Sequence, residues 1–123
     1  MELTGTHLRY LMTIYRLYMD SGEVRMTEIA NAIHVKKSSV ARIITIFREE
    51  NILKQEHYGK IGLTEYGIEL AETYFAKVRR VAVCLQRSGL QLEKEEAFDI
   101  ACLMLPELPK RCLENNLKKV VDN

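Results

Sequence analysis

Two short helical patterns separated by a few polar residues constrain this chain more than any other feature of its sequence. Thr27 can N-cap a first helix that runs to Ile33 and carries its apolar residues on one face. Residues 34–37 interrupt that pattern, and Ser38 or Ser39 can then cap a second helix. The apolar positions of this second helix follow the spacing i, i+3, i+4 and i+7: Val40, Ile43, Ile44 and Phe47. Two short helices joined by a tight turn predict a helix-turn-helix motif.

The beginning of the second helix carries positive charges and hydroxyl groups. Five candidate contact residues lie in the turn and the first helical turn: Lys36, Lys37, Ser38, Ser39 and Arg42. Residues 30–47 contain no Asp or Glu, and a helix N-terminus also offers free backbone N–H groups. Such a surface suits phosphate oxygens and base edges in a major groove. A solvated polar face is the alternative, but cations at an N-terminal end oppose the helix dipole and need another reason to be there. We therefore expect double-stranded DNA as the partner.

A small hairpin is expected directly after this helix, in the position called a wing. Residues 52–58 can form one strand, Gly59 and Lys60 can turn, and residues 61–64 can return. Tyr58 and Lys60 would lie at the tip, where an aromatic ring and a cation can reach a phosphate or a minor groove. A hairpin tip also favours such residues for solubility alone.

The second half of the chain predicts a helical unit. Thr64 can cap a helix over residues 64–88, which Ser88 and Gly89 would end, and a last helix can begin at Pro106. Residues 97–105 have Asp99 as their one charge, so this helix needs cover on nearly all faces, and a second copy of the chain is the simplest cover. The sequence thus predicts a mainly α protein with a winged helix-turn-helix DNA-binding domain at residues 1–66. A helical dimerisation domain at residues 67–123 would share the long helix.

Charge and cysteine usage exclude several classes of protein. The net charge is +1, and residues 1–63 hold nine Lys and Arg against seven Asp and Glu, so any DNA contact must come from a local patch. Three cysteines without a C-x-x-C pair argue against a disulfide framework or a zinc ribbon. No apolar stretch approaches the roughly 20 residues of a membrane span, and no leader pattern opens the chain, so we expect a cytoplasmic protein.

The three histidines do not predict an enzyme. His7, His34 and His57 fall at a helix start, in a turn and in a strand, and none has a partnered Ser, Cys or carboxylate pattern.

The order of these parts resembles the diphtheria toxin repressor and manganese transport regulator family of metal-dependent repressors. The resemblance covers nearly the full length, and its segments are YLMTIYRL, EIANAIHVKKSSVARII and GLTEYGIELA. Its most specific pieces are SSV at residues 38–40 and the LTxxG pattern at residues 63–67. It implies a homodimeric winged-helix repressor that binds a palindromic operator through residues 36–42. It also implies Mn(II) or Fe(II) bound between the two domains.

The positions at which the family holds its metal ligands carry other residues here. Arg9, Met12 and Val78 stand at the positions on the first and the long helix. Two registers are open for the fifth helix, one giving Ile100, Leu103 and Met104, the other giving Phe98, Ala101 and Cys102. Neither supplies the oxygen and imidazole ligands that Mn(II) or Fe(II) needs. We therefore expect no metal cofactor and a former site filled with apolar side chains. A softer, relocated site is the alternative, using Cys102, Met104, Met12 or Cys84.

Two functions remain open at this point. The first is a repressor-like transcription regulator that no longer depends on Mn or Fe. The second is a winged-helix module that uses the same surface for a protein partner, which the nearly neutral net charge allows. These patterns specify neither the operator nor an effector.

Overall fold

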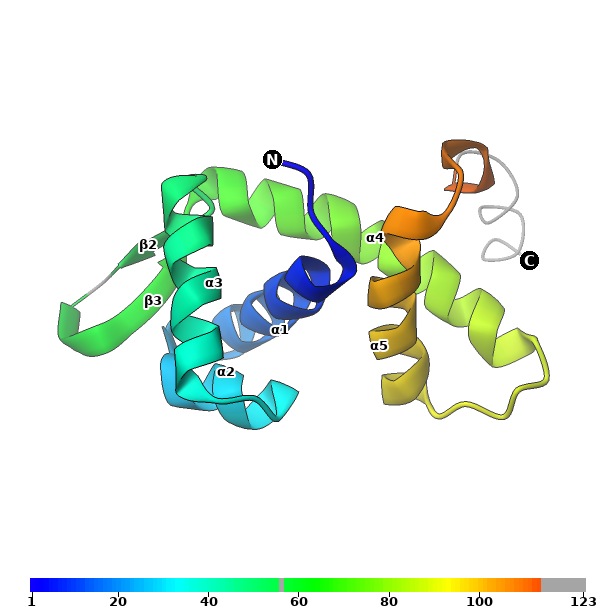
Figure 1. Ribbon diagram of the computed structural model, residues 1–123, viewed down its shortest axis with the longest axis horizontal. Coiled ribbons are helices and arrows are strands. Elements are labelled where there is room, and N and C mark those ends of the chain that lie inside the picture. The colour runs from blue at the N-terminus through cyan, green and yellow to red at the C-terminus, as the bar shows by residue number, and fades with distance from the viewer. Residues whose placement is uncertain (56, 114–123) are drawn as a thin grey trace. The chain divides into compact units, whose positions relative to one another are not determined.

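The structure is a computed structural model that describes residues 1–55 and 57–113 of the chain. It is mainly helical, as the sequence predicts, and it contains a small sheet (Figure 1). Its elements follow one another in the order α1 (Gly5–Ser21), β1 (Val24–Arg25), α2 (Met26–Ile33), α3 (Lys37–Glu49), β2 (Leu53–Gln55), a 3-10 turn (His57–Gly59), β3 (Lys60–Leu63), α4 (Glu65–Arg87), α5 (Lys94–Met104) and a second 3-10 turn (Leu105–Glu107).

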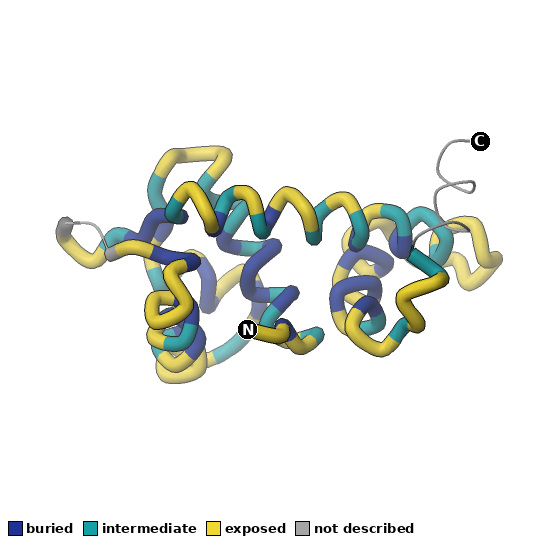
Figure 2. Tube along the Cα trace, turned by 90° about the horizontal axis from the view of Figure 1, so that it is seen from above, coloured by how far each residue is buried: buried dark blue, intermediate teal, exposed yellow. Residues whose placement is uncertain are grey.

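The chain divides into two compact units. The first unit consists of Met1 and residues 9–72, and the second consists of residues 2–8 and the chain from Thr73 onward. Helices α1 and α4 therefore contribute residues to both units. Buried and exposed positions alternate along each of these helices (Figure 2), as expected for amphipathic segments.

The first unit is a winged helix-turn-helix. Its three strands form an antiparallel sheet in the order β1-β3-β2, in which Val24 pairs with Ile61 and Leu53 pairs with Leu63. Its buried core takes one apolar face from each helix and the inner side of the sheet: Leu11, Ile14, Val24, Ile29, Ile33, Val40, Ile44, Phe47, Ile52, Leu53, Ile61 and Leu63. The four positions that predicted the face of the second helix are all buried. The apolar spacing in the sequence therefore marks the packed side of α3.

The wing is shorter than its sequence suggests. β2 ends at Gln55, and Tyr58 and Gly59 adopt left-handed conformations with φ of 63° and 74°. These two residues close the turn, so Lys60 belongs to β3 and pairs with Arg25. The prediction that Lys60 lies at the tip is therefore wrong, because the reversal is complete one residue earlier.

Both helices of the motif begin before the residues expected to cap them. The N-cap of α2 is Arg25 and not Thr27. The Arg25 backbone N–H donates to Glu28 Oε1 at 3.1 Å. The N-cap of α3 is Lys36, so neither Ser38 nor Ser39 is the cap. The reason is His34, which ends α2 in a left-handed conformation and lets the chain restart two residues later.

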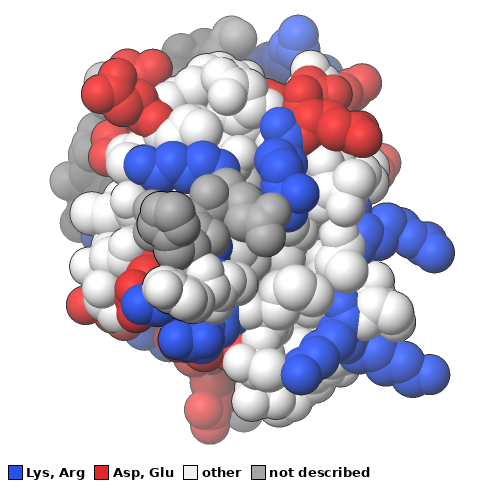
Figure 3. Space-filling view, turned by 90° about the vertical axis from the view of Figure 1, so that its left-hand side faces the viewer, with Lys and Arg blue, Asp and Glu red and all other residues white. Residues whose placement is uncertain are grey.

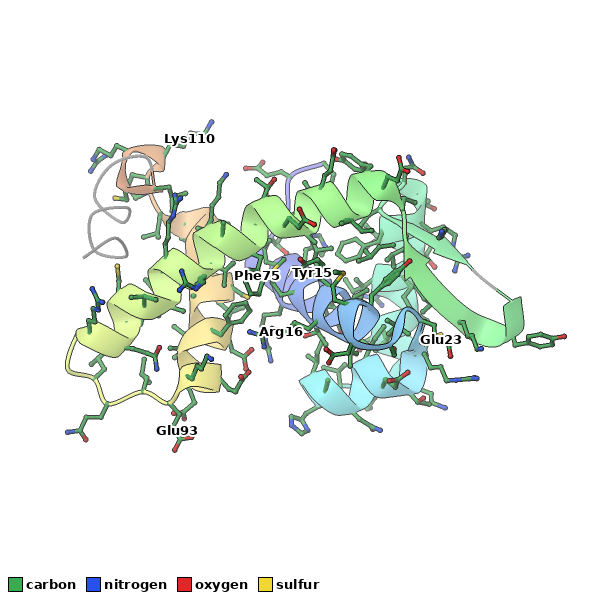
Figure 4. The ribbon with its side chains drawn as sticks, turned by 180° about the vertical axis from the view of Figure 1, so that it is seen from behind. Tyr15, Arg16, Glu23, Phe75, Glu93 and Lys110 are labelled. Carbon is green, nitrogen blue, oxygen red and sulfur yellow. The ribbon has the colours of Figure 1, made fainter. Side chains whose placement is uncertain are left out.

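The second unit is helical. α5 buries Ala97, Phe98, Ala101 and Cys102, and the rings of Phe98 and Phe75 lie 5.6 Å apart between centroids. Figure 4 shows Phe75 on the side of α4 that faces α5. Gly5 lies so close to the Leu103 backbone that a Cβ there would approach Leu103 Cα to 2.8 Å. The beginning of the chain is thus packed tightly against α5.

The expected last helix does not begin at Pro106. Pro106 lies in the 3-10 turn Leu105–Glu107, and Leu108 is extended, with φ of −79° and ψ of 141°. The cause is Pro109, because a proline disfavours the helical conformation in the residue before it. The later part of that predicted helix, from residue 114, lies outside the described residues. None of the helices in residues 1–55 and 57–113 combines the length and the hydropathy of a membrane span.

Candidate nucleic-acid interface

The candidate interface begins with the exposed face of α3. Val40, Ile43, Ile44 and Phe47 hold the other face of the helix in the core. All five predicted contact residues of this helix are consequently exposed, at its first turns and in the turn before it: Lys36, Lys37, Ser38, Ser39 and Arg42. Burial of one face thus presents the cationic start of the helix to solvent.

The cations of this surface have no acidic partners among the residues that the structure describes. Within the part of the chain that the structure describes, Lys36, Lys37 and Arg42 form no ion pair, and the first turn of α3 holds no acidic residue. They lie at the end of the helix that carries the positive pole of the macrodipole. An anion placed here would interact favourably both with the side chains and with the helix terminus.

Thr45 extends this surface, although the sequence reasoning did not single it out. It is exposed and follows Ser38 and Arg42 at the spacing i, i+4 and i+7, so the three share one stripe of α3. Its hydroxyl donates to the Ala41 carbonyl oxygen at 3.0 Å. Its methyl group suits apolar contact with a thymine methyl group. The sequence could have indicated Thr45, because helical spacing alone places it on the same face as Ser38 and Arg42.

The wing offers an aromatic tip and a paired lysine. Tyr58 is 90% exposed in the turn, whereas Lys60 is half-buried. Lys60 Nζ lies 2.8 Å from Glu23 Oε2 at the base of the wing, where Figure 4 labels Glu23. Figure 3 shows the face that carries the wing, with Lys and Arg side chains across it and most Asp and Glu side chains toward its margins. The structure thus exposes Tyr58 fully and engages Lys60 in an ion pair.

Hydrogen bonds around Ile52 tie the end of α3 to the start of α4. The Ile52 N–H donates to Phe47 O at 2.8 Å, and Ile52 O accepts from the Thr64 N–H at 3.1 Å. Thr64 Oγ1 donates to Asn51 O at 2.7 Å and accepts from the Gly67 N–H at 2.9 Å, so Thr64 caps α4 as predicted. Gly67 is required because a Cβ there would lie 2.1 Å from Ile52 O. This junction fixes the end of α3 to the start of α4.

The positions of the expected metal ligands carry side chains unsuited to Mn(II) or Fe(II). Met12 and Val78 are buried and Arg9 is half-buried. The Arg9 Nε atom is buried and has no hydrogen-bond partner among the described residues. A guanidinium cannot donate an electron pair to a metal ion, and Val78 has no donor atom.

The two registers of the fifth helix differ in burial. Phe98, Ala101 and Cys102 are buried, whereas Ile100 and Leu103 are 37% and 45% exposed and Met104 is half-buried. Among residues 1–55 and 57–113, no three His, Cys, Asp or Glu side chains come together as a metal site would require. The donor set at the family positions therefore does not fit a hard or borderline divalent ion.

The alternative, a relocated site for a softer metal ion, would use sulfur ligands that include the Cys84 thiol. Burial raises the pKa of the Cys84 thiol, and the nearby Arg87 charge partly opposes that shift. Cys84 is half-buried and Cys102 is buried. A raised pKa keeps the thiol protonated at neutral pH, which works against metal binding through its thiolate.

Two of the histidines, His7 and His34, lie at the ends of helices. The His7 N–H donates to Thr4 Oγ1 at 3.1 Å, and the Thr4 N–H donates to His7 Nδ1 at 3.3 Å, at the start of α1. His34 forms the left-handed end of α2. Both therefore shape helix termini.

The comparisons with known proteins agree on the fold. Residues 2–61 match the family described as iron dependent repressor, N-terminal DNA binding domain. IdeR of T. acidophilum is 20% identical with a TM-score of 0.77, over 97% of this chain and 55% of IdeR. The manganese regulator SloR is 21% identical with a TM-score of 0.75, over 99% of this chain and 55% of SloR.

A third solved structure, ScaR with bound Zn²⁺, is 23% identical with a TM-score of 0.67, over 94% of this chain and 53% of ScaR. The chain thus spans about half the length of each of these three proteins. No curated protein sequence matches the chain.

Proposed function

Because this chain belongs, through residues 2–61, to the iron-dependent repressor family of DNA-binding domains, we propose that it is a transcription regulator acting through α3. The observation that carries the proposal is the exposed start of that helix, where Lys36, Lys37 and Arg42 lack acidic partners within the described residues. Helix α3 would lie in the major groove with the wing beside the backbone. A regulator of transcription works where the DNA is, so a cytoplasmic location belongs to this proposal.

Phosphate contacts and base contacts have different signatures in binding experiments. Lys36→Met or Lys37→Met removes a contact to phosphate, which weakens binding to all sequences and lowers the salt slope by about one. Ser39→Ala and Arg42→Met act on base edges and change the preferred sequence, at roughly 1–3 kcal/mol for a bidentate contact. Fluorescence anisotropy over a salt series and binding-site selection measure the two effects.

Lys94→Met is the matched control for loss of one charge, because Lys94 is exposed on α5 and outside this surface. It should leave the salt slope unchanged. The groove assignment fails if the α3 variants behave like this control. Flow-through of the full chain from a mixed-DNA column at low salt would instead favour a protein-interaction module on the same surface.

The wing contact is part of the same proposal, with unequal roles for its two residues. Tyr58 is exposed at the tip, so Tyr58→Ala should weaken DNA binding. Lys60 is already paired with Glu23, so Lys60→Met should have the smaller effect. Equal losses for the two variants would contradict this assignment.

We propose that the regulator is a homodimer on a palindromic operator. The support is the apolar surface left on α5, where Ile100 and Leu103 are exposed, and Leu90, 65% exposed, in the preceding loop. A second copy would cover this surface, and two-fold symmetry would set half-sites about one helical turn or a multiple of it apart. Sedimentation of the wild type and of Ile100→Asp/Leu103→Asp tests the interface: the wild type should be dimeric and the variant monomeric.

Independence from Mn and Fe is the last part of the proposal. It is supported by Arg9 and Val78 at positions where the family places ligands. Operator affinity should be the same with EDTA as with added Mn(II) or Fe(II). Calorimetry with Mn(II), Fe(II), Zn(II) and Cu(I) checks this directly. Stoichiometric binding of Mn(II) or Fe(II) at micromolar or tighter affinity would overturn it, and binding of Zn(II) or Cu(I) would indicate the softer cysteine site.

A further inference from the structure

A cavity of about 410 Å³ lies within the second unit, and all its lining residues belong to that unit. Its apolar wall includes Leu3, Leu8 and Leu105, which are all buried. Leu108 and Leu113 are half-buried and line it as well. The volume falls within the range of roughly 300–1,000 Å³ typical of small-molecule sites. The cavity is therefore large enough for an organic molecule, and the buried residues of its lining are aliphatic.

The charged groups of this cavity do not neutralise one another. Its lining residues include Lys77, Lys110 and Glu2, whose formal charges sum to +1. Lys77 Nζ lies 5.4 Å from the ring centroid of Tyr74, which is its one contact of this kind in the described chain. Neither lysine forms an ion pair among the described residues. Figure 4 shows Lys110 on the segment beyond α5, with its side chain extending away from the helices. The lining thus combines two lysines with a hydrocarbon wall, and the Lys110 side chain would have to turn inward to reach a bound molecule.

We propose that this cavity is a binding site for an amphiphilic monocarboxylate with an aliphatic body. The leucine side chains would cover the hydrocarbon, and burial of apolar area would drive binding. Lys77 and Lys110 would hold the carboxylate, since an ammonium is a compact point charge that needs no planar fork of acceptors. A single negative charge matches the local sum of +1, whereas a phosphate group carries roughly −1.5 to −2. This inference does not depend on DNA binding.

Decanoate is a suitable test molecule for the full chain. Calorimetry should give one saturable site per chain, and the methyl resonances of Leu3, Leu8 and Leu105 should shift in NMR spectra. Acetate, which has the headgroup alone, should not bind measurably. Decylammonium has the same body with the opposite charge, and it should bind at least about tenfold more weakly, the change that 1.4 kcal/mol produces.

Variants separate the charge from the cavity. Lys77→Met/Lys110→Met should weaken decanoate binding about tenfold or more, whereas Lys94→Met removes an exposed charge outside the cavity and should change it less than about twofold. Leu108→Trp should fill the cavity and abolish binding while circular dichroism and thermal unfolding show a folded protein.

Three results would overturn the proposal. One is a full chain that shows no saturable site for decanoate. Another is an affinity for decanoate equal to that for decylammonium. The third combines two observations: the wild type does not bind decanoate, and Leu108→Trp changes the oligomeric state. That result would mean that a second copy of the chain occupies the cavity.

Discussion

Replacing Gly67 by alanine should destabilise the junction between α3 and α4. The new Cβ would lie 2.1 Å from Ile52 O, and ordinary contact begins at 3.4 Å, so the carbonyl group must retreat by about 1.3 Å. Ile52 O accepts the Thr64 N–H, and Ile52 N holds the end of α3 through Phe47 O. A flexible side chain cannot absorb this shift, because both colliding atoms belong to the backbone framework.

The expected change in the free energy of unfolding is the sum of three losses and one gain. Overpacking costs about 1–3 kcal/mol, and disturbing the Thr64 cap and its backbone hydrogen bond costs about 1 kcal/mol each. Alanine returns about 1 kcal/mol through its higher helix propensity. The expected net loss is about 2–4 kcal/mol, which lowers the melting temperature by roughly 10 °C or more. Thermal and urea unfolding measure it, and DNA affinity should fall as well, because Ile52 follows α3 closely in the chain.

Gly89→Ala is the matched control. Gly89 has φ of +90°, and no heavy atom lies within 4 Å of the position that its Cβ would take, so alanine there meets backbone strain without a collision. Its cost should be about 1–2 kcal/mol, with no change in DNA affinity. If Gly67→Ala is as stable as the wild type, or more stable, the close approach at Ile52 does not restrict this position and the reasoning fails.

Three further predictions concern the second unit and α1. Phe98→Ala should cost about 3–5 kcal/mol in urea unfolding, because it removes a buried ring that contacts Phe75; a loss below about 1 kcal/mol would contradict the packing. Cys84 should be alkylated by iodoacetamide more slowly than free cysteine at about pH 8, and mass spectrometry should show the rate rising at higher pH, because a raised pKa leaves less thiolate at a given pH. Arg9→Met should leave stability unchanged or raise it by about 1 kcal/mol, since it removes a buried Nε that has no partner in the described part of the chain; a large loss would reveal a partner for that atom.

The helical framework could be predicted from the sequence because its signals are local. The spacing of Val40, Ile43, Ile44 and Phe47 marked the buried face of α3, and the helix expected over residues 64–88 is α4, Glu65–Arg87. Apolar periodicity and the two ends of α4 involve residues a few positions apart, so a single segment contains the whole signal.

The boundaries and the details of the candidate interface were harder to predict. Ser38 and Ser39 are good caps by type, but the left-handed turn at His34 decided where α3 begins. Lys60 was expected at the tip of the wing, and the turn closed before it. In each case the local sequence allows several positions for the helix start or the turn. Pairing with a distant strand or packing of the helix determines which one is adopted.

The sequence alone determined that this chain forms amphipathic helices around a helix-turn-helix with a cationic start, because side-chain type and spacing encode those features within each segment. Tertiary structure decided which of the apolar residues are covered. Ala101 and Leu103 lie two residues apart in an apolar helix, yet the first is buried and the second is 45% exposed. It also gathered Leu3, Lys77 and Leu108 around one cavity. Burial and cavities depend on neighbours that are distant along the chain, so they arise only when the helices pack.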